Sequence, residues 1–251
     1  MEREITIKRD GLNLFGLFTE PDGKYDSLCI MLHGFGGAFE KGLAGMMDYL
    51  VDGIVNAGIA VLRFDFNGHG KSDGSFSDMN LLNEVCDSIA ALKYARNMKG
   101  IKHIYFLGHS QGGVVAGLMA GYYHDVIEKL VLIAPAASLV EDARAGRCMS
   151  AEYDTEHIPE IVSVDGRPVG GSMFRTAKTI PIYETAALYN NKALIVYGKW
   201  DRVVTEEGVR KYTDAMPGAR INIYERLDHG MNGHDCSQMI KDVVSFLGEN
   251  L

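Results

Sequence analysis

The stretch Ile104-Tyr105-Phe106-Leu107-Gly108-His109-Ser110-Gln111-Gly112-Gly113 decides the fold of this 251-residue chain. An apolar run meets a Gly-x-Ser-x-Gly pattern, and small and apolar residues that can form a helix follow directly. This is the sequence form of a nucleophile elbow, a sharp strand-to-helix turn that exposes a serine hydroxyl above a sheet. Because the turn brings backbone segments close together, we expect a Cβ at Gly108 or Gly112 to clash. The stretch therefore predicts that Ser110 is a nucleophile for acyl transfer.

A second match to the pattern, Gly70-Lys71-Ser72-Asp73-Gly74, shows that the pattern alone is weak in a chain with 29 glycines. The surrounding sequence separates the two serines. Ser72 lies several residues past an apolar run, and the next helical pattern begins only near Asn80. We therefore assign Ser72 to a loop, whereas Ser110 follows its strand by two residues and leads into a helix.

Apolar periodicity predicts alternating strands and helices along most of the chain. Strands are predicted over 5–7, 12–19, 27–32, 59–66, 104–107, 130–134, 193–197 and 221–224. Helical spacing covers Leu43, Met46, Met47, Leu50 and Ile54, then 82–92, 114–123, 206–215 and 239–247. This order predicts an α/β fold with a mostly parallel, eight-stranded sheet and helices on both faces.

Residues 137–182 interrupt the alternation. They read as irregular apart from a short hairpin at Asp165-Gly166. We expect residues 1–136 and 183–251 to form the core and residues 137–182 to form a short inserted cap over one end of the sheet.

The partners of the serine are predicted from the ends of later strands, because reacting groups of an open parallel sheet lie beyond its carboxyl edge. Asp201 comes just past the strand 193–197, and His229 just past the strand 221–224. The order Ser110, Asp201, His229 is a known order for a serine triad. In that arrangement His229 takes the Ser110 proton, while Asp201 orients the imidazole.

Rival residues exist for both partners. His33 and His69 also follow strand ends, but neither has a carboxylate past a neighbouring strand in the right order. Asp228 and Glu225 are rivals for the acid, although Asp228 adjoins the histidine and adjacent side chains seldom point at each other.

An oxyanion hole needs two backbone N–H groups aimed at the reacting oxygen. One is expected from Gln111, directly after the nucleophile, and the other from Phe35 in the loop His33-Gly-Phe-Gly-Gly.

Composition excludes several other functions. The net charge of −8 argues against nucleic-acid binding, and no apolar run approaches the length of a membrane span. The first residues lack an apolar signal segment, so we expect a cytoplasmic protein. The four cysteines are scattered without metal-ligand spacing. We therefore expect no metal, no organic cofactor and no nucleic-acid or membrane partner; the oligomeric state is left open, with a homodimer as one alternative.

Four landmarks together resemble the α/β-hydrolase superfamily over essentially the whole chain. They are His33-Gly-Phe-Gly-Gly, Arg63-Phe-Asp-Phe-Asn-Gly-His-Gly-Lys-Ser-Asp-Gly, Gly108-His-Ser-Gln-Gly-Gly, and the strand-end Asp201 and His229. Within the superfamily the chain resembles bacterial feruloyl (cinnamoyl) esterases in its His-Gly-Phe and Gly-His-Ser-Gln-Gly motifs and its short cap. The resemblance implies an α/β-hydrolase fold and the release of hydroxycinnamic acids from plant-derived esters.

The same resemblance implies that the cap recognises the acyl ring. Asp142 matches a polar cap position and is a hydrogen-bond candidate, while Met173 and Phe174 are candidate apolar walls. That Asp142 is only an exposed loop carboxylate stays open. The leading hypothesis is a serine carboxylesterase acting on small hydroxycinnamoyl esters. The alternative is a general short-chain carboxylesterase or a monoacylglycerol lipase-like esterase with the same triad. A catalytically idle binding protein is disfavoured because no triad member is missing.

Overall fold

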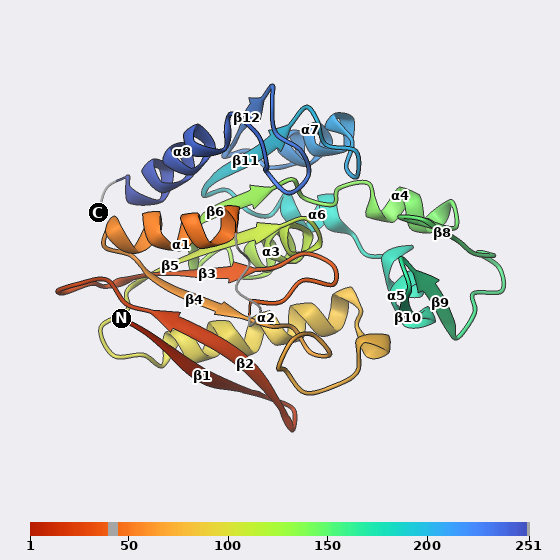
Figure 1. Cartoon of the computed structure of the whole chain (residues 1–251), viewed down its shortest axis with the longest axis horizontal. Helices are drawn as coiled ribbons and strands as arrows, with labels where there is room; N and C mark the ends of the chain where they lie inside the picture. The colour runs from red at the N-terminus through yellow and green to blue at the C-terminus, as the bar shows by residue number, and fades with distance from the viewer. Residues whose placement is uncertain (40–44, 250–251) are drawn as a thin grey trace.

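A computed structural model describes residues 1–39 and 45–249 and shows a central sheet between layers of helices (Figure 1). Within these residues the main sheet has eight strands in the order β1-β2-β4-β3-β5-β6-β11-β12. Only the pairs β1–β2 and β2–β4 of this sheet are antiparallel. The predicted fold class is confirmed. The strands are β1 (Glu2–Arg9), β2 (Leu12–Thr19), β3 (Ser27–Leu32), β4 (Ala60–Phe64), β5 (His103–His109), β6 (Ile127–Ile133), β11 (Lys192–Gly198) and β12 (Ala219–Tyr224).

Helices cover both faces of this sheet, as the strand residues require. In β3 every residue is buried: Leu28, Ile30 and Leu32 join one apolar core, and Cys29 and Met31 join the other. The first core is closed by α2 (Leu81–Arg96) and α3 (Gln111–Tyr122), which pack against each other. The second is closed by α1 (Met46–Asn56) and α8 (Cys236–Gly248). A continuous apolar run is therefore the expected signature of β3.

Local signals set the helix ends. The Asn80 side chain accepts a hydrogen bond from the Asn83 N–H and starts α2, and Thr205 does the same for α7 (Glu206–Ala215). After α1, Gly58 adopts a positive φ of 86°, a conformation that glycine adopts at a lower energetic cost than other residues because it has no Cβ. Leu43, expected on that helix, lies outside the described residues. Among the described helices, none is long and apolar enough to cross a membrane.

The segment between β6 and β11 is more regular than the sequence indicated. It contains α4 (Leu139–Arg144), β7 (Arg147–Cys148), β8 (Ala151–Glu152), β9 (Ile161–Val164), β10 (Arg167–Gly170), α5 (Gly171–Ala177) and α6 (Ile182–Ala186). In Figure 1 α4, α5 and the β9–β10 hairpin lie together at one end of the sheet, on the right of the view. The expectation of irregular structure was wrong, because α4 and α5 have six and seven residues, too few for a helical period to repeat.

The hairpin predicted within this segment is confirmed. Strands β9 and β10 pair antiparallel, with Val164 opposite Arg167. The turn residues Asp165 and Gly166 have φ values of 48° and 77°. Two successive positive φ angles are the mark of a tight two-residue turn that matches the twist of the strands.

Candidate active site

Ser110 stands at the turn between β5 and α3 in a strained backbone conformation. Its φ is 56° and its ψ is −121°, a region that non-glycine residues rarely occupy. The neighbouring strand holds it there: the Ser110 N–H donates to the Ile133 carbonyl at 2.9 Å, and the Ala136 N–H donates to the Ser110 carbonyl at 3.0 Å. The turn therefore presents the hydroxyl at the carboxyl edge of the sheet.

The glycines of the elbow are required by space. A Cβ on Gly108 would lie 2.1 Å from the Gly112 carbonyl oxygen, and a Cβ on Gly112 would lie 2.3 Å from the His33 carbonyl oxygen. These clashes confirm the steric expectation drawn from the sequence. Gly34 approaches from the other side, where a Cβ would lie 3.0 Å from the Ser110 Cβ. The loop after β3 thus packs directly against the serine.

The structure brings Ser110, His229 and Asp201 into one hydrogen-bonded line. His229 Nε2 lies 2.9 Å from Ser110 Oγ, and His229 Nδ1 lies 2.8 Å from Asp201 Oδ2. The three residues come from β5–α3, from the loop after β12 and from the loop after β11. A base within hydrogen-bond reach of a hydroxyl, itself oriented by a carboxylate, is the geometry that activates a serine.

The Asp201 carboxylate is held in its charged form. Burial raises its pKa, but the His229 hydrogen bond and the backbone N–H groups of Val204 and Val203 outweigh burial, so the pKa lies below its usual value. Both N–H groups donate to Asp201 Oδ1, at 2.7 Å from Val203 and 2.8 Å from Val204. The charged carboxylate fixes the imidazole with its proton on Nδ1 and its lone pair toward Ser110.

The rival acids are bound elsewhere. Asp228 accepts hydrogen bonds from Asn232, including its backbone N–H at 2.8 Å. Glu225 pairs with Lys199 at 2.7 Å.

His109 is a residue of this site that the sequence reasoning missed. Its Nε2 lies 2.8 Å from the backbone carbonyl oxygen of His229. Burial, helped by the nearby His229, lowers the pKa of His109 to about 4, so the ring is neutral near pH 7. Facing a carbonyl, Nε2 carries the proton and donates. The signal was its place inside the Gly-His-Ser-Gln-Gly motif, which alone does not reveal a partner 120 residues away.

The candidate oxyanion-hole residues Phe35 and Gln111 flank Ser110. Neither backbone N–H donates a hydrogen bond to any residue in 1–39 and 45–249. The loop carrying Phe35 is fixed by His33, whose Nδ1 lies 2.8 Å from the Gly34 carbonyl and whose Nε2 accepts from the Phe66 N–H at 3.1 Å. Burial lowers the pKa of His33 to about 3, which keeps the ring neutral. Two backbone donors that have no partner in the described part of the chain and lie beside a nucleophile can stabilise a negative oxygen.

A cavity of about 440 Å³ opens at Ser110. Its walls include all the residues expected from the sequence to form the oxyanion hole and to touch substrate: Phe35, Gln111, Asp142, Met173 and Phe174. Asp142 is engaged at the wall by the Ser138 hydroxyl at 2.9 Å and by Arg147 at 3.0 Å. The sequence reasoning missed Arg147, Cys148, Met149 and Arg202, which also line the cavity.

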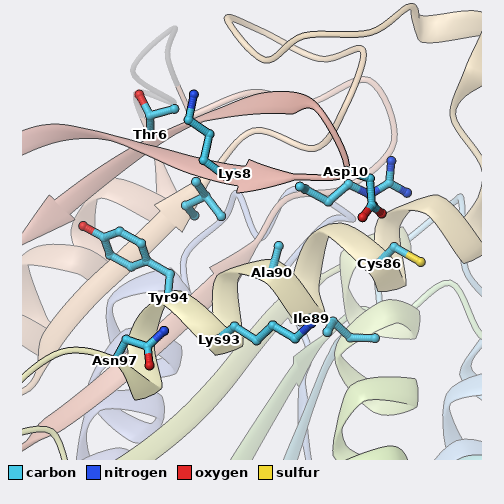
Figure 2. Close-up of a pocket in the computed structure, with 11 residues that line it drawn as sticks. Thr6, Lys8, Asp10, Cys86, Ile89, Ala90, Lys93, Tyr94 and Asn97 are labelled. Carbon is cyan, nitrogen blue, oxygen red and sulfur yellow. The ribbon is translucent and has the colours of Figure 1, made fainter.

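A second cavity, of about 450 Å³, lies between β1 and α2 (Figure 2). Lys8, Asp10, Cys86, Lys93 and Tyr94 are among its lining residues, and none of the candidate site residues is. Of these two cavities, the one at Ser110 therefore joins a binding space to the hydrogen-bonded residues Ser110, His229 and Asp201.

Ser72, in the second Gly-x-Ser-x-Gly match, has a different environment. Its hydroxyl accepts from the Phe15 N–H at 2.9 Å and donates to the Asp65 carbonyl at 2.5 Å. Both contacts join a loop to the sheet, so Ser72 has a structural role that requires no catalytic function. Among the described residues, no group of three or more His, Cys, Asp or Glu side chains is arranged to hold a metal ion.

Comparisons with known proteins show the family and the fold of the chain. The model of the family described as serine aminopeptidase, S33, matches residues 23–162. A 2-hydroxy-6-oxononadienedioate/2-hydroxy-6-oxononatrienedioate hydrolase of Paraburkholderia phymatum is 34% identical, over 88% of this chain and 86% of that protein. A monoacylglycerol lipase of Mycolicibacterium smegmatis is 23% identical, over 92% and 91%.

Among solved structures, Est1E from Butyrivibrio proteoclasticus with ferulic acid bound is similar to this chain along almost its whole length. The TM-score is 0.92 and the identity 30%, with 97% of each chain covered.

Proposed function

The chain belongs to the serine aminopeptidase S33 family of α/β-hydrolases, and we propose that it is a serine carboxylesterase cleaving hydroxycinnamoyl (feruloyl-type) esters. One observation carries the proposal. The Ser110 hydroxyl, 2.9 Å from His229 Nε2, opens into a cavity walled by Met173 and Phe174 and reaching Asp142. The likeness to a structure that holds ferulic acid supports the same acyl group.

The proposed reaction has two stages. His229 takes the Ser110 proton as the hydroxyl oxygen attacks the ester carbonyl, and the imidazolium is stabilised by Asp201. The negative oxygen of the tetrahedral intermediate accepts from the N–H groups of Phe35 and Gln111. As the intermediate collapses and its ester C–O bond breaks, the His229 imidazolium gives its proton to the departing oxygen; the neutral alcohol leaves and an acyl-enzyme remains. Water, deprotonated by His229, then attacks the acyl carbonyl; as the bond from the acyl carbon to Ser110 Oγ breaks, the imidazolium returns the proton to Oγ, and the acid is released.

The cavity wall supports an aromatic acyl group. Met173 and Phe174 are buried side chains on α5, and the Tyr153 ring contacts the Phe174 ring at a tilt of 40°, with centroids 4.4 Å apart. Such an apolar wall suits a flat ring. Asp142, already held by Ser138 and Arg147, can accept a hydrogen bond from a ring hydroxyl.

The test is kcat/KM for methyl ferulate against p-nitrophenyl butyrate, with Ser110→Ala as the blank. We expect a ratio that favours ferulate and a loss of turnover in the blank on the scale of ~10⁶, as for other serine triads. Activity on butyrate alone would replace the proposal with a short-chain or monoacylglycerol-type esterase. Cleavage of an aminoacyl anilide but of neither ester would point to an aminopeptidase instead.

Asp142→Ala, which removes the hydrogen-bond acceptor altogether, tests the acyl specificity separately. We expect this variant to lose activity on methyl ferulate and to keep its activity on p-nitrophenyl butyrate. Equal losses on both esters would remove Asp142 from ring recognition.

A further inference from the structure

A carboxyl group lies buried behind the nucleophile elbow. Glu84 of α2 has only 1% of its surface exposed, and its Oε1 accepts a hydrogen bond from Gln111 Nε2 at 2.7 Å. The same Nε2 lies 3.4 Å from the Met79 sulfur. Glu84 Oε2 has no hydrogen-bond partner among the residues that the structure describes. The buried Glu84 carboxyl group therefore binds the side chain of Gln111, and the backbone N–H of Gln111 is a candidate oxyanion donor.

No cation in the described structure balances Glu84. Helix α2 packs against α3, β1, α5 and β3. Neither α3 nor β3 carries a charged side chain. Arg9 of β1 pairs instead with Asp87 at 3.2 Å, and Arg175 of α5 donates to the Ile158 carbonyl at 2.8 Å. The charged side chain that acts on Glu84 from its own helix is Asp87, which is itself buried.

This setting favours the neutral acid. Burial raises the pKa of Glu84 to about 8; the Gln111 hydrogen bond opposes that rise, and the charge of Asp87 adds to it. An isolated buried carboxylate is costly, so such a group keeps its proton through neutral pH.

We propose that Glu84 is a positioning residue: its neutral carboxyl anchors Gln111 so that the backbone N–H of Gln111 meets the developing oxyanion, and its ionisation opposes catalysis. The proposal rests on the esterase function above. The anchor acts at the first residue of α3, directly after the strained Ser110, where a small rotation would turn the N–H away. Ionised Glu84 would place negative charge behind the hole, where it repels the oxyanion through a poorly screened interior.

The effect falls on the transition state, because the oxyanion exists there and not in the bound ester. We therefore expect kcat to fall by roughly tenfold as Glu84 ionises, with KM little changed. In the pH profile of the wild-type kcat, this fall should form an alkaline limb with its midpoint near the pKa of Glu84, about 8.

The experiment compares kcat and KM from about pH 6 to 10 for the wild type, Glu84→Gln and Asp87→Asn, on an ester without an ionisable group. Glutamine keeps the acceptor for Gln111 but cannot ionise, so Glu84→Gln should retain activity near pH 7 and lose the alkaline limb. Asp87→Asn is the matched control, since Asp87 is a second buried acid of α2 and accepts hydrogen bonds from Asn67, not from Gln111. This control should keep the limb, moved to lower pH because the charge of Asp87 no longer helps to raise the pKa of Glu84.

A second readout does not depend on activity. A carboxyl whose pKa is raised by folding stabilises the protein below its unfolded pKa and loses that contribution as pH rises through the folded pKa. The free energy of unfolding should therefore fall between about pH 4 and 8 in the wild type, and this fall should be much smaller in Glu84→Gln.

The outcomes separate the two proposals. No ester hydrolysis by the wild type would overturn the esterase function and the positioning role together. Normal hydrolysis with an unchanged alkaline limb in Glu84→Gln would overturn the claim that ionised Glu84 opposes catalysis, and an unchanged kcat at pH 7 in Glu84→Leu, which removes the acceptor for Gln111, would overturn the anchor. Both results leave the esterase function standing. Loss of the limb in Asp87→Asn as well would also overturn the positioning role, because any buried acid of α2 would then suffice.

Discussion

His109 and His229 are joined by a hydrogen bond from the His109 ring to the His229 backbone carbonyl, at 2.8 Å. The two residues flank the serine from different directions: His109 precedes Ser110 on β5, and His229 arrives on the loop after β12. The bond therefore ties the loop that carries the base to the strand that carries the nucleophile.

Replacing His109 by Phe should keep a flat ring and remove the donor. The His229 loop would lose its tie to β5, so we expect kcat to fall by on the order of tenfold to a hundredfold, with a small change in KM. Steady-state kinetics on the preferred ester measures this. His103→Phe is the control, because His103 is a half-exposed histidine that pairs with Glu128. An unchanged kcat in His109→Phe would show that the loop holds its position without the bond.

Gly108→Ala should destabilise the fold itself. The added Cβ would meet the Gly112 carbonyl oxygen at 2.1 Å, and backbone cannot move aside cheaply there. We expect a loss of about 3 kcal/mol or more in the free energy of unfolding, measured by urea titration. Gly248→Ala, where a Cβ meets nothing within 4 Å, is the control and should be neutral or slightly stabilising. Equal stability of the two variants would refute the steric account.

The elbow and the order of strands could be predicted from the sequence because both depend on local patterns. The continuous apolar run over 27–32 predicted β3, and the Gly-x-Ser-x-Gly pattern predicted the turn at Ser110. Strand ends then limited the choice of Asp201 and His229. Each of these inferences uses residues close together in the chain.

Contacts between distant segments could not be predicted in this way. Two such contacts are the hydrogen bond from His109 to His229 and the one from Gln111 to Glu84. They depend on how β5, α2 and α3 pack, and neither produces a periodic pattern in the sequence. The short helices α4 and α5 were missed for a related reason. Each is stabilised by packing against its neighbours rather than by a repeat of its own.

Ser72→Ala should leave catalysis intact and weaken the fold. Its hydroxyl joins the Phe15 N–H to the Asp65 carbonyl, so truncation leaves both without that partner. We expect kcat/KM within about twofold of the wild type and a loss of about 1–3 kcal/mol in the free energy of unfolding. A large fall in kcat with unchanged stability would instead give the second Gly-x-Ser-x-Gly match a chemical role.

Asp201→Asn should separate orientation from charge. The asparagine oxygen can still accept from Val203 and Val204, which turns its NH₂ group toward His229 Nδ1. That donor favours the tautomer with the proton on Nε2, which cannot take the Ser110 proton. We expect kcat to fall by about 10⁴. A fall of less than tenfold would show that the imidazole does not depend on Asp201 for its tautomer.

The difference in the free energy of unfolding between the wild type and Asp201→Asn should decrease as the pH falls. Because the folded pKa of Asp201 lies below its usual value, the carboxylate stabilises the native state above the unfolded pKa. That contribution is lost as pH falls through the folded pKa. The stability gap between the wild type and Asp201→Asn should thus be full at pH 7 and shrink below about pH 4. Urea unfolding at both pH values measures the gap. A gap that widens in acid would mean that burial, not the His229 contact, dominates the Asp201 carboxyl.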